Sequence, residues 1–165
     1  MTSGNHFGPR NATAQSVWTE ADFESMGWHD NVVHGFALEP DLEHASCVLI
    51  DLDYIVEWVK PIPPERQITF WIAPATLVFR DARDVTFDMD ETGIAFRGMS
   101  LDGILGSEQD LHGFRTWTLA GHEFTLTVRS QGFTQYLRRR PIRSTNQRLD
   151  LVARGGLGFD EAGFS

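Results

Sequence analysis

Apolar and polar side chains alternate one by one over long stretches of this chain. Every second residue from 48 to 58 is apolar, and three of the residues between them are acidic: Asp51, Asp53 and Glu57. A period of two is that of an extended strand whose two faces meet different surroundings. Similar alternation recurs in three other stretches, 32–38, 85–89 and 124–128. Because no helical pattern separates these stretches, the sequence predicts a mainly β fold, an antiparallel sandwich or roll.

One short helix is expected near the N-terminus. Thr19 can cap the free N–H groups of a helix that ends near Gly27. Glu20 and Asp22 then lie at the positive end of the helix dipole, which stabilises them. The predicted fold is therefore β-rich with one short N-terminal helix.

Turn and proline signals subdivide the rest of the chain. A hairpin is expected over 85–99, with Gly93 in its turn, and a second hairpin over 114–130. Residues 100–112 lack clear periodicity and are expected to form a loop. Pro74 should split 68–79 into two strands or mark a bulge or an edge, because proline donates no ladder hydrogen bond.

The 165 residues have the length of one domain, and residues 18–152 are expected to form it. Residues 1–17 are polar and residues 153–165 rich in glycine, so both predict flexible ends. No apolar run could span a bilayer or serve as a signal peptide. The single cysteine, Cys47, forms no internal disulfide, has no basic neighbour beside it and is expected to be inert. A cytoplasmic protein with no membrane contact is predicted.

Charge is distributed unevenly along the sequence. The net charge is −9, which argues against nucleic-acid binding. Residues 11–59 hold ten acidic residues and no Lys or Arg, whereas 138–154 hold six Arg and one Asp. Two interpretations remain open. In the first, the arginine segment packs near the acidic half, or both segments are solvated. In the second, the acidic half forms a surface that attracts a basic protein partner.

The most unusual cluster is Trp28-His29-Asp30, with His34 four residues later. His and Asp side chains bind zinc and other divalent metals, although only the turn at 29–30 could bring these three together. The structural alternative is that His29 and Asp30 satisfy backbone groups between helix and strand. His34 would then be a half-buried histidine on the core face of its strand.

Asp51 and Asp53 share the strand face opposite the apolar residues, and Glu57 lies on the same face. This face is expected to be solvated or to meet something charged; a carboxylate pair for acid–base chemistry or calcium is the other interpretation. The candidate ligand- or partner-binding residues are Trp28, His29, Asp30, His34, Asp51, Asp53 and Glu57. No catalytic residue and no metal site is assigned.

Sequence motifs for nucleophilic catalysis and for cofactor binding are absent. The chain contains no G-x-S-x-G, P-loop or H-E-x-x-H motif, and no G-x-G-x-x-G after a strand. Arg138-Arg139-Arg140 could clamp a phosphate, although a solvated tail or an internal ion-pair partner is the commoner role. No cofactor is predicted, and the sequence leaves open whether the protein is an enzyme.

Three segments carry a resemblance to known proteins: MGWHDNVVH at 26–34, DLDYIVEW at 51–58 and FWIAPATLVF at 70–79. Over residues 19–90 the chain resembles a group of small, uncharacterised bacterial β-rich proteins, which implies a bacterial cytoplasmic protein. It is similar, more loosely, to small β-rich immunity proteins of toxin systems, several of which carry a Trp-His-Asp or His-Asp-Ser element before the first strand. Asn31 stands where that pattern often has serine.

Three classes of function follow. The first expectation is a non-enzymatic module, of the immunity type in one form, that binds a basic protein through an acidic surface. The alternative is a small-ligand or metal-binding protein or enzyme, with its site around Trp28, His29, Asp30 and His34. A structural or oligomer-forming role is the third.

Overall fold

The structure of the chain is a computed structural model, which describes residues 15–40, 46–89 and 98–165. These residues are mainly β, as the alternation predicts, with ten strands in one open antiparallel sheet and only short helices. The elements are β1 (Val17–Thr19), η1 (Glu20–Ser25), β2 (Val32–Glu39), β3 (Cys47–Val59), β4 (Thr69–Phe79), β5 (Arg83–Met89), β6 (Met99–Gly106), β7 (Arg115–Gly121), β8 (Phe124–Ser130), β9 (Thr134–Leu137), β10 (Ile142–Ser144) and α1 (Leu151–Arg154).

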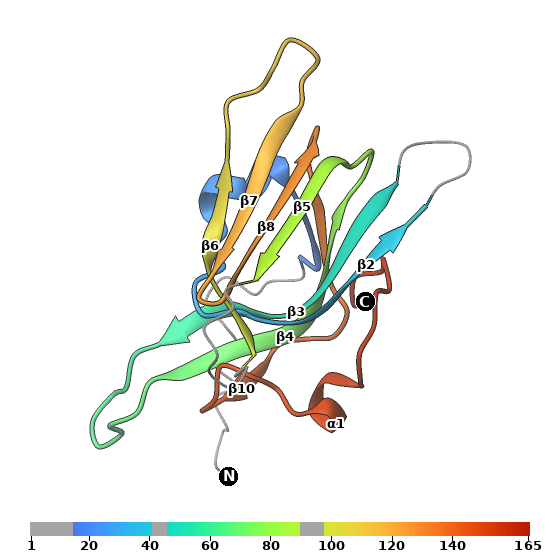
Figure 1. The fold of residues 1–165 in the computed structure, drawn as a ribbon. Helices are drawn as coiled ribbons and strands as arrows, with labels where there is room; N and C mark the ends of the chain where they lie inside the picture. Colours follow the sequence, from blue (N-terminus) through green and yellow to red (C-terminus); the bar gives the residue numbers. More distant parts are fainter. Residues whose placement is uncertain (1–14, 41–45, 90–97) are drawn as a thin grey trace.

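The sheet folds over on itself into two layers. Its strand order is β1-β9-β4-β3-β2-β6-β7-β8-β5, and β10 pairs with β4 beside β9. β2 pairs with β3 along its length but with β6 only at Val32 and Val33. This short junction lets β6, β7, β8 and β5 lie across β2, β3 and β4 (Figure 1). The main core fills the space between the layers and includes Ile50, Leu77 and Trp117.

The C-terminal part of the chain covers the other face of β3 and β4. β10 pairs with the first half of β4, and α1 follows it (Figure 1). A second apolar cluster lies on this face: Ile55, Phe70, Ile72 and Leu149. β3 is thus buried on both faces, although its alternating sequence is typical of a strand with one wet face.

Pro74 lies inside β4 without breaking it. The strand is continuous from Thr69 to Phe79, so the expected split is wrong. On one side of β4, β10 pairs with 70–72 and β9 with 75–78, and Pro74 lies between them. Its carbonyl accepts from the Arg138 N–H on that side. Because the N and C=O of one strand residue point to the same side, the missing proline N–H falls in the gap between β9 and β10.

The predicted N-terminal helix forms as the short 3-10 helix η1. The Thr19 side chain accepts from the Ala21 N–H, and the Asp22 side chain accepts from the Thr19 N–H, which makes a reciprocal cap. The hairpin predicted over 114–130 is confirmed as β7 and β8. Both features depend on local sequence signals, which explains why they could be predicted.

Two predictions concern residues 85–112: a loop over 100–112 and a hairpin over 85–99. Residues 99–106 form β6 rather than a loop; a register shift between Leu101 and Gly103 disrupts the alternation that would reveal a strand. β5 pairs with β8, whereas most of the partner segment of its predicted hairpin, 94–97, lies outside the described residues.

The predicted flexible C-terminal end, 153–165, has defined contacts. The Phe164 N–H donates to the Leu137 carbonyl, and Arg140 donates to the carbonyl of Ser165. Of the predicted N-terminal tail, residues 1–14 lie outside the described residues and Val17 begins β1. None of the helices in the described ranges has the length and apolar character needed to cross a bilayer.

Candidate functional site

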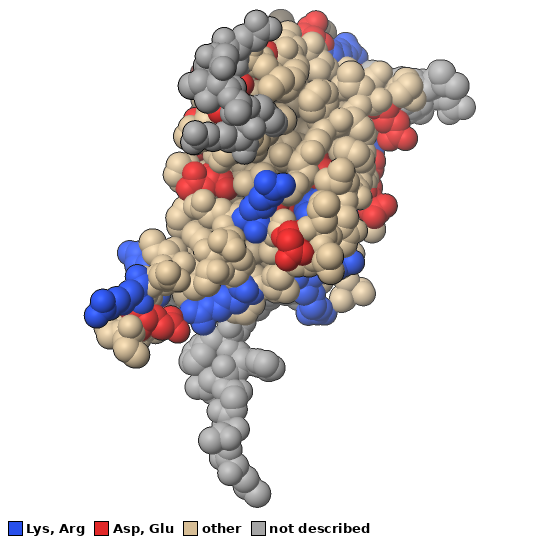
Figure 2. Space-filling model, turned by 60° about the horizontal axis from the view of Figure 1, so that its bottom comes forward, with Lys and Arg blue, Asp and Glu red and all other residues tan. Residues whose placement is uncertain are grey.

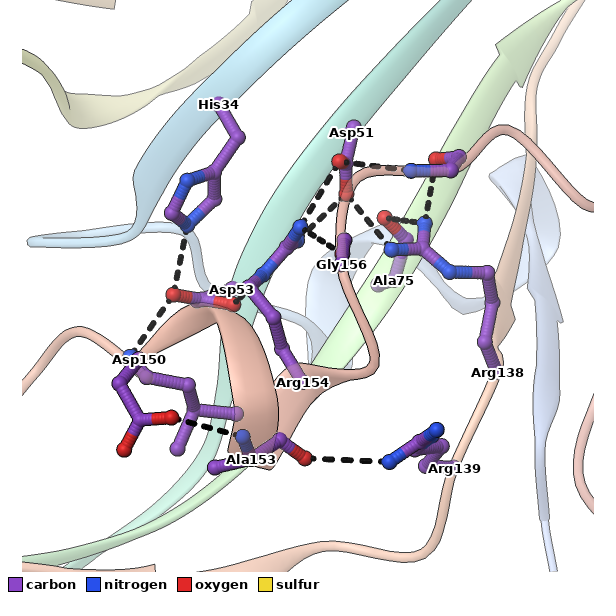
Figure 3. A network of polar contacts seen from close by, with 12 residues as sticks. His34, Asp51, Asp53, Ala75, Arg138, Arg139, Asp150, Ala153, Arg154 and Gly156 are labelled. Carbon is purple, nitrogen blue, oxygen red and sulfur yellow. Dashed lines mark hydrogen bonds and ion pairs between the residues drawn. The ribbon is translucent and has the colours of Figure 1, made fainter.

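Asp51 and Asp53 are buried, and the expectation of a solvated acidic face is wrong. Their side chains are 1% and 0% exposed. They point away from the main core, as the alternation of β3 predicts, but the C-terminal segment lies over them (Figure 3). Something charged meets them there, which was the other half of the expectation.

Arg154 is the central partner of both acids. Its Nε donates to Asp53 at 3.0 Å, while Nη1 and Nη2 donate to the two oxygens of Asp51 at 2.9 and 2.5 Å. Nη1 also donates to the Gly156 carbonyl at 2.6 Å. The guanidinium of Arg154 therefore bridges two carboxylates, which suits its planar fork of donors.

Two local features hold Arg154 in position. Asp150 caps α1 by accepting from the Ala153 N–H at 2.7 Å. Gly155 ends the helix with φ of 77°, in the left-handed region that glycine tolerates best. The short helix thus turns Arg154 toward β3 and then turns the chain away.

Arg138, directly after β9, is the second partner. Its Nη2 donates to Asp51 at 2.7 Å, and its Nη1 lies 2.8–2.9 Å from three acceptors: the Ala75 carbonyl, the Thr76 hydroxyl and the Gly158 carbonyl. The internal ion-pair role expected for the arginine segment is confirmed for Arg138. The phosphate clamp is not formed by this residue, because its donors are used inside the protein.

Burial and ion pairing have opposite effects on the pKa of Asp51. Burial alone would raise it, but the hydrogen bonds and charges of Arg154 and Arg138 outweigh burial and hold the pKa below its ordinary value. Burial likewise opposes the charge of Arg154, yet its bonds to Asp51 and Asp53 raise its pKa. Both side chains are therefore charged at neutral pH.

His34 joins the same cluster from β2, next to a bulge in that strand. Val33 lies opposite Leu52 and Gly35 lies opposite Asp51, so His34 is an extra residue. Before the bulge Val32 lies opposite Asp53, and after it Phe36 lies opposite Ile50 of the core, so His34 shares the acidic face and not the face of Phe36. The predicted place of His34 on the core face is therefore wrong. His34 Nε2 lies 2.8 Å from Asp53 Oδ2, and its side chain is 5% exposed. We call His34, Asp51, Asp53, Arg138 and Arg154 the buried ionic network.

The other predicted site residues do not join this network. Trp28 is in the main core, where its Nε1 donates to Gln135 at 2.8 Å. His29 is exposed and stacks on Trp58 with the ring planes 13° apart. Asp30 has φ of 61° and accepts from Gln147 at 2.9 Å.

The seven predicted residues therefore do not all converge on one site, and only His34, Asp51 and Asp53 lie together. Glu57 is half-buried on β3 beyond a second register shift, opposite Trp71. Among the described residues no three His, Cys, Asp or Glu side chains are placed to hold a metal ion.

The buried ionic network neutralises itself. Two carboxylates meet two guanidiniums, and Leu149 and Gly158 add backbone N–H bonds to Asp53 and Asp51. A self-contained cluster of this kind attaches the C-terminal segment to β3 and leaves its acids little access to a ligand. Charge asymmetry along the sequence was the signal for it, but the identity of the pairs was not readable.

An open depression lies beside the network. It has a volume of about 670 Å³ and is lined by Val32 and residues 146–151. Gln147, the partner of Asp30, is one of the lining residues. The depression is lined by neither His34 nor the two buried acids.

Exposed apolar side chains gather at β5 and the outer half of β2. We call them the apolar edge surface: Phe36, Leu38, Val85, Phe87 and Met89, between 37% and 59% exposed. The Phe36 and Phe87 rings are 4.9 Å apart. Phe87 and Met89 lie opposite the core residues Leu126 and Phe124 of β8. The surface therefore continues the main core outward, and no sequence signal singled it out.

β5 is also the last strand of the sheet. Within the described ranges it pairs with β8 alone, so its second edge presents backbone N–H and C=O groups that no strand covers. All seven residues of β5 are exposed. Asp88 on β5 and Glu39 at the end of β2 place exposed acidic groups beside the apolar edge surface.

The side of the molecule that carries β10 and α1 has both basic and acidic side chains. Figure 2 shows Lys and Arg side chains across the face where β10 and α1 lie. Arg143 in β10 is exposed, as are Arg140 before this strand and Arg148 after it. The acidic half of the sequence thus does not form one acidic face on this side.

Comparisons of the chain with protein-family models, with curated proteins and with solved structures found no match.

Proposed function

We propose that this protein is a protein-binding module and that its contact surface is the apolar edge surface. One observation carries the proposal: five large apolar side chains are exposed together beside the open edge of β5. Soluble proteins rarely expose a contiguous apolar patch of this kind unless it contacts a partner.

Charge supports a basic partner. The net charge is −9, and Asp88 and Glu39 flank the apolar edge surface. Asp51 and Asp53 do not contribute, because Arg154 and Arg138 neutralise them. The acidic attraction therefore comes from exposed acids near β5 and from the overall charge, which steer a basic protein toward this surface.

The resemblances fit the same class of function. An immunity protein acts by binding another protein, so the looser similarity to that group supports a binding role. A bacterial cytoplasmic location belongs to the proposal as well, on the resemblance of residues 19–90 and on the single cysteine.

Site-specific photocrosslinking tests the proposal. A photoreactive benzoyl-phenylalanine replaces Leu38 on the apolar edge surface, and in a matched control it replaces the exposed Leu111 of the β6–β7 loop. We expect a protein adduct from position 38 whose yield falls as salt rises from about 50 to 500 mM. Equal adducts from both positions, or none from position 38, would overturn the proposal.

A further inference from the structure

We infer that the partner presents an extended segment that pairs with the open edge of β5, with apolar side chains alternating with basic ones. This inference rests on the proposed function and names the partner's chemistry. Its first support is the backbone of β5: no strand in the described part of the chain pairs with its outer N–H and C=O groups, which can form a ladder with an added strand.

The two faces of β5 determine which side chains such a segment would carry. Phe87 and Met89 lie on the inner face, next to Phe36. Thr86 and Asp88 lie on the outer face, opposite Thr127 and Thr125 of β8. Because side chains of an added strand alternate in step with those of β5, every second residue would contact the apolar edge surface. The residues between would lie beside Asp88.

Charge decides between two occupants of this edge. A second copy of this chain would bring another net charge of −9 and a second Asp88 close to the first. Like charges on neighbouring strands destabilise the pair. A basic segment instead places a positive side chain beside Asp88. The residues of β8 on this face, Thr125 and Thr127, carry no charge that could neutralise Asp88. The geometry therefore favours a basic partner over self-association.

Binding of synthetic peptides to the full chain, measured by fluorescence anisotropy, tests the inference. The probe is the alternating peptide acetyl-KVKFKVKVK-amide, and the control has the same composition in blocks, acetyl-KKKVFVVKK-amide. We expect the alternating peptide to bind at least about tenfold more tightly, since only it matches both faces of β5. An acidic analogue with Glu at each Lys position should not bind.

Backbone methylation tests the strand pairing itself. One version of the alternating peptide is N-methylated at the Val and Phe positions, the other at the internal Lys positions. Since alternate N–H groups of a strand point to opposite edges, one version should lose about tenfold or more in affinity and the other should retain it. Equal binding of both versions would overturn the pairing.

Two substitutions separate this inference from the proposed function. Asp88→Lys should weaken the alternating peptide and admit the acidic analogue, whereas Leu38→Asp should weaken any segment on the apolar edge surface. If Leu38→Asp weakens binding but methylation has no effect, the contact surface stands and strand pairing is wrong. If neither substitution affects binding, both proposals fail. Failure of every peptide to bind, or a dimer in sedimentation that Leu38→Asp disrupts, overturns the inference alone.

Discussion

Replacing Arg154 with methionine removes the cation that bridges Asp51 and Asp53. The substitution keeps a long side chain but leaves both buried carboxylates without their main partner. Breaking a buried ion pair by removing one member costs about 3–5 kcal/mol, because the remaining charge is buried without compensation. Four hydrogen bonds from Arg154 are lost at once, so we expect the upper half of that range.

The cost can be measured by urea denaturation at pH 7. Domains of this size have unfolding free energies of about 5–15 kcal/mol, so Arg154→Met should unfold at clearly lower urea. Arg143→Met is the matched control: its ion pair with Glu65 is half exposed, and its loss should cost about 1 kcal/mol or less.

A double variant isolates the ionic contribution. Asp51→Asn with Arg154→Met should cost less than the sum of the two single substitutions, because each single substitution leaves an uncompensated charge. A loss below about 1 kcal/mol for Arg154→Met, or strict additivity in the double variant, would refute the buried ionic network as described.

Three other outcomes follow from the structure. The lowered pKa of Asp51 means that its ionised form stabilises the fold. This contribution is complete above the unfolded pKa of 3.8 and is lost as pH falls through the folded pKa. Acid unfolding followed by circular dichroism should therefore depend less steeply on pH for Asp51→Asn. Burial raises the pKa of Tyr54 to about 12, so its protonated form stabilises the fold and this contribution is lost as pH rises from 10 through 12. The unfolding free energy should fall by about 2 kcal/mol between pH 10 and 12, measured by urea titrations at each pH, and Tyr54→Phe should remove that dependence. Asp150→Ala removes the cap of α1 and should lower the unfolding free energy by about 0.5–2 kcal/mol in the same urea assay; an unchanged value would show that the cap does not hold Arg154 in place.

The alternation of apolar and polar residues was sufficient to predict the strands in which it is regular. β3, β7 and β8 alternate regularly, and η1 carries a capping residue, so their existence could be read from the sequence. Bulges account for two errors. A single extra residue shifts the phase of every side chain that follows, so His34 and Phe36 lie on opposite faces of β2, and β6 lost its visible pattern.

The burial of Asp51 and Asp53 could not be predicted because the segment that covers them has almost no regular structure. β10 has three residues and α1 has four, which is too short for a periodic signal. The excess of arginine at 138–154 did indicate a partner for the acidic half, but only the fold pairs Arg154 with Asp51 and Asp53. The apolar edge surface was missed for a similar reason, since the position of β5 at the sheet edge depends on long-range pairing.

Hydrogen exchange measured by mass spectrometry tests the central functional claim most directly. The full chain is labelled with and without a saturating amount of the alternating peptide, acetyl-KVKFKVKVK-amide. Pairing at the open edge of β5 should slow exchange at residues 83–89, while residues 134–165, which include Arg138 and Arg154 of the buried ionic network, should exchange as before. Unchanged exchange at 83–89, or protection confined to another segment, would contradict the assignment of the apolar edge surface as the binding site.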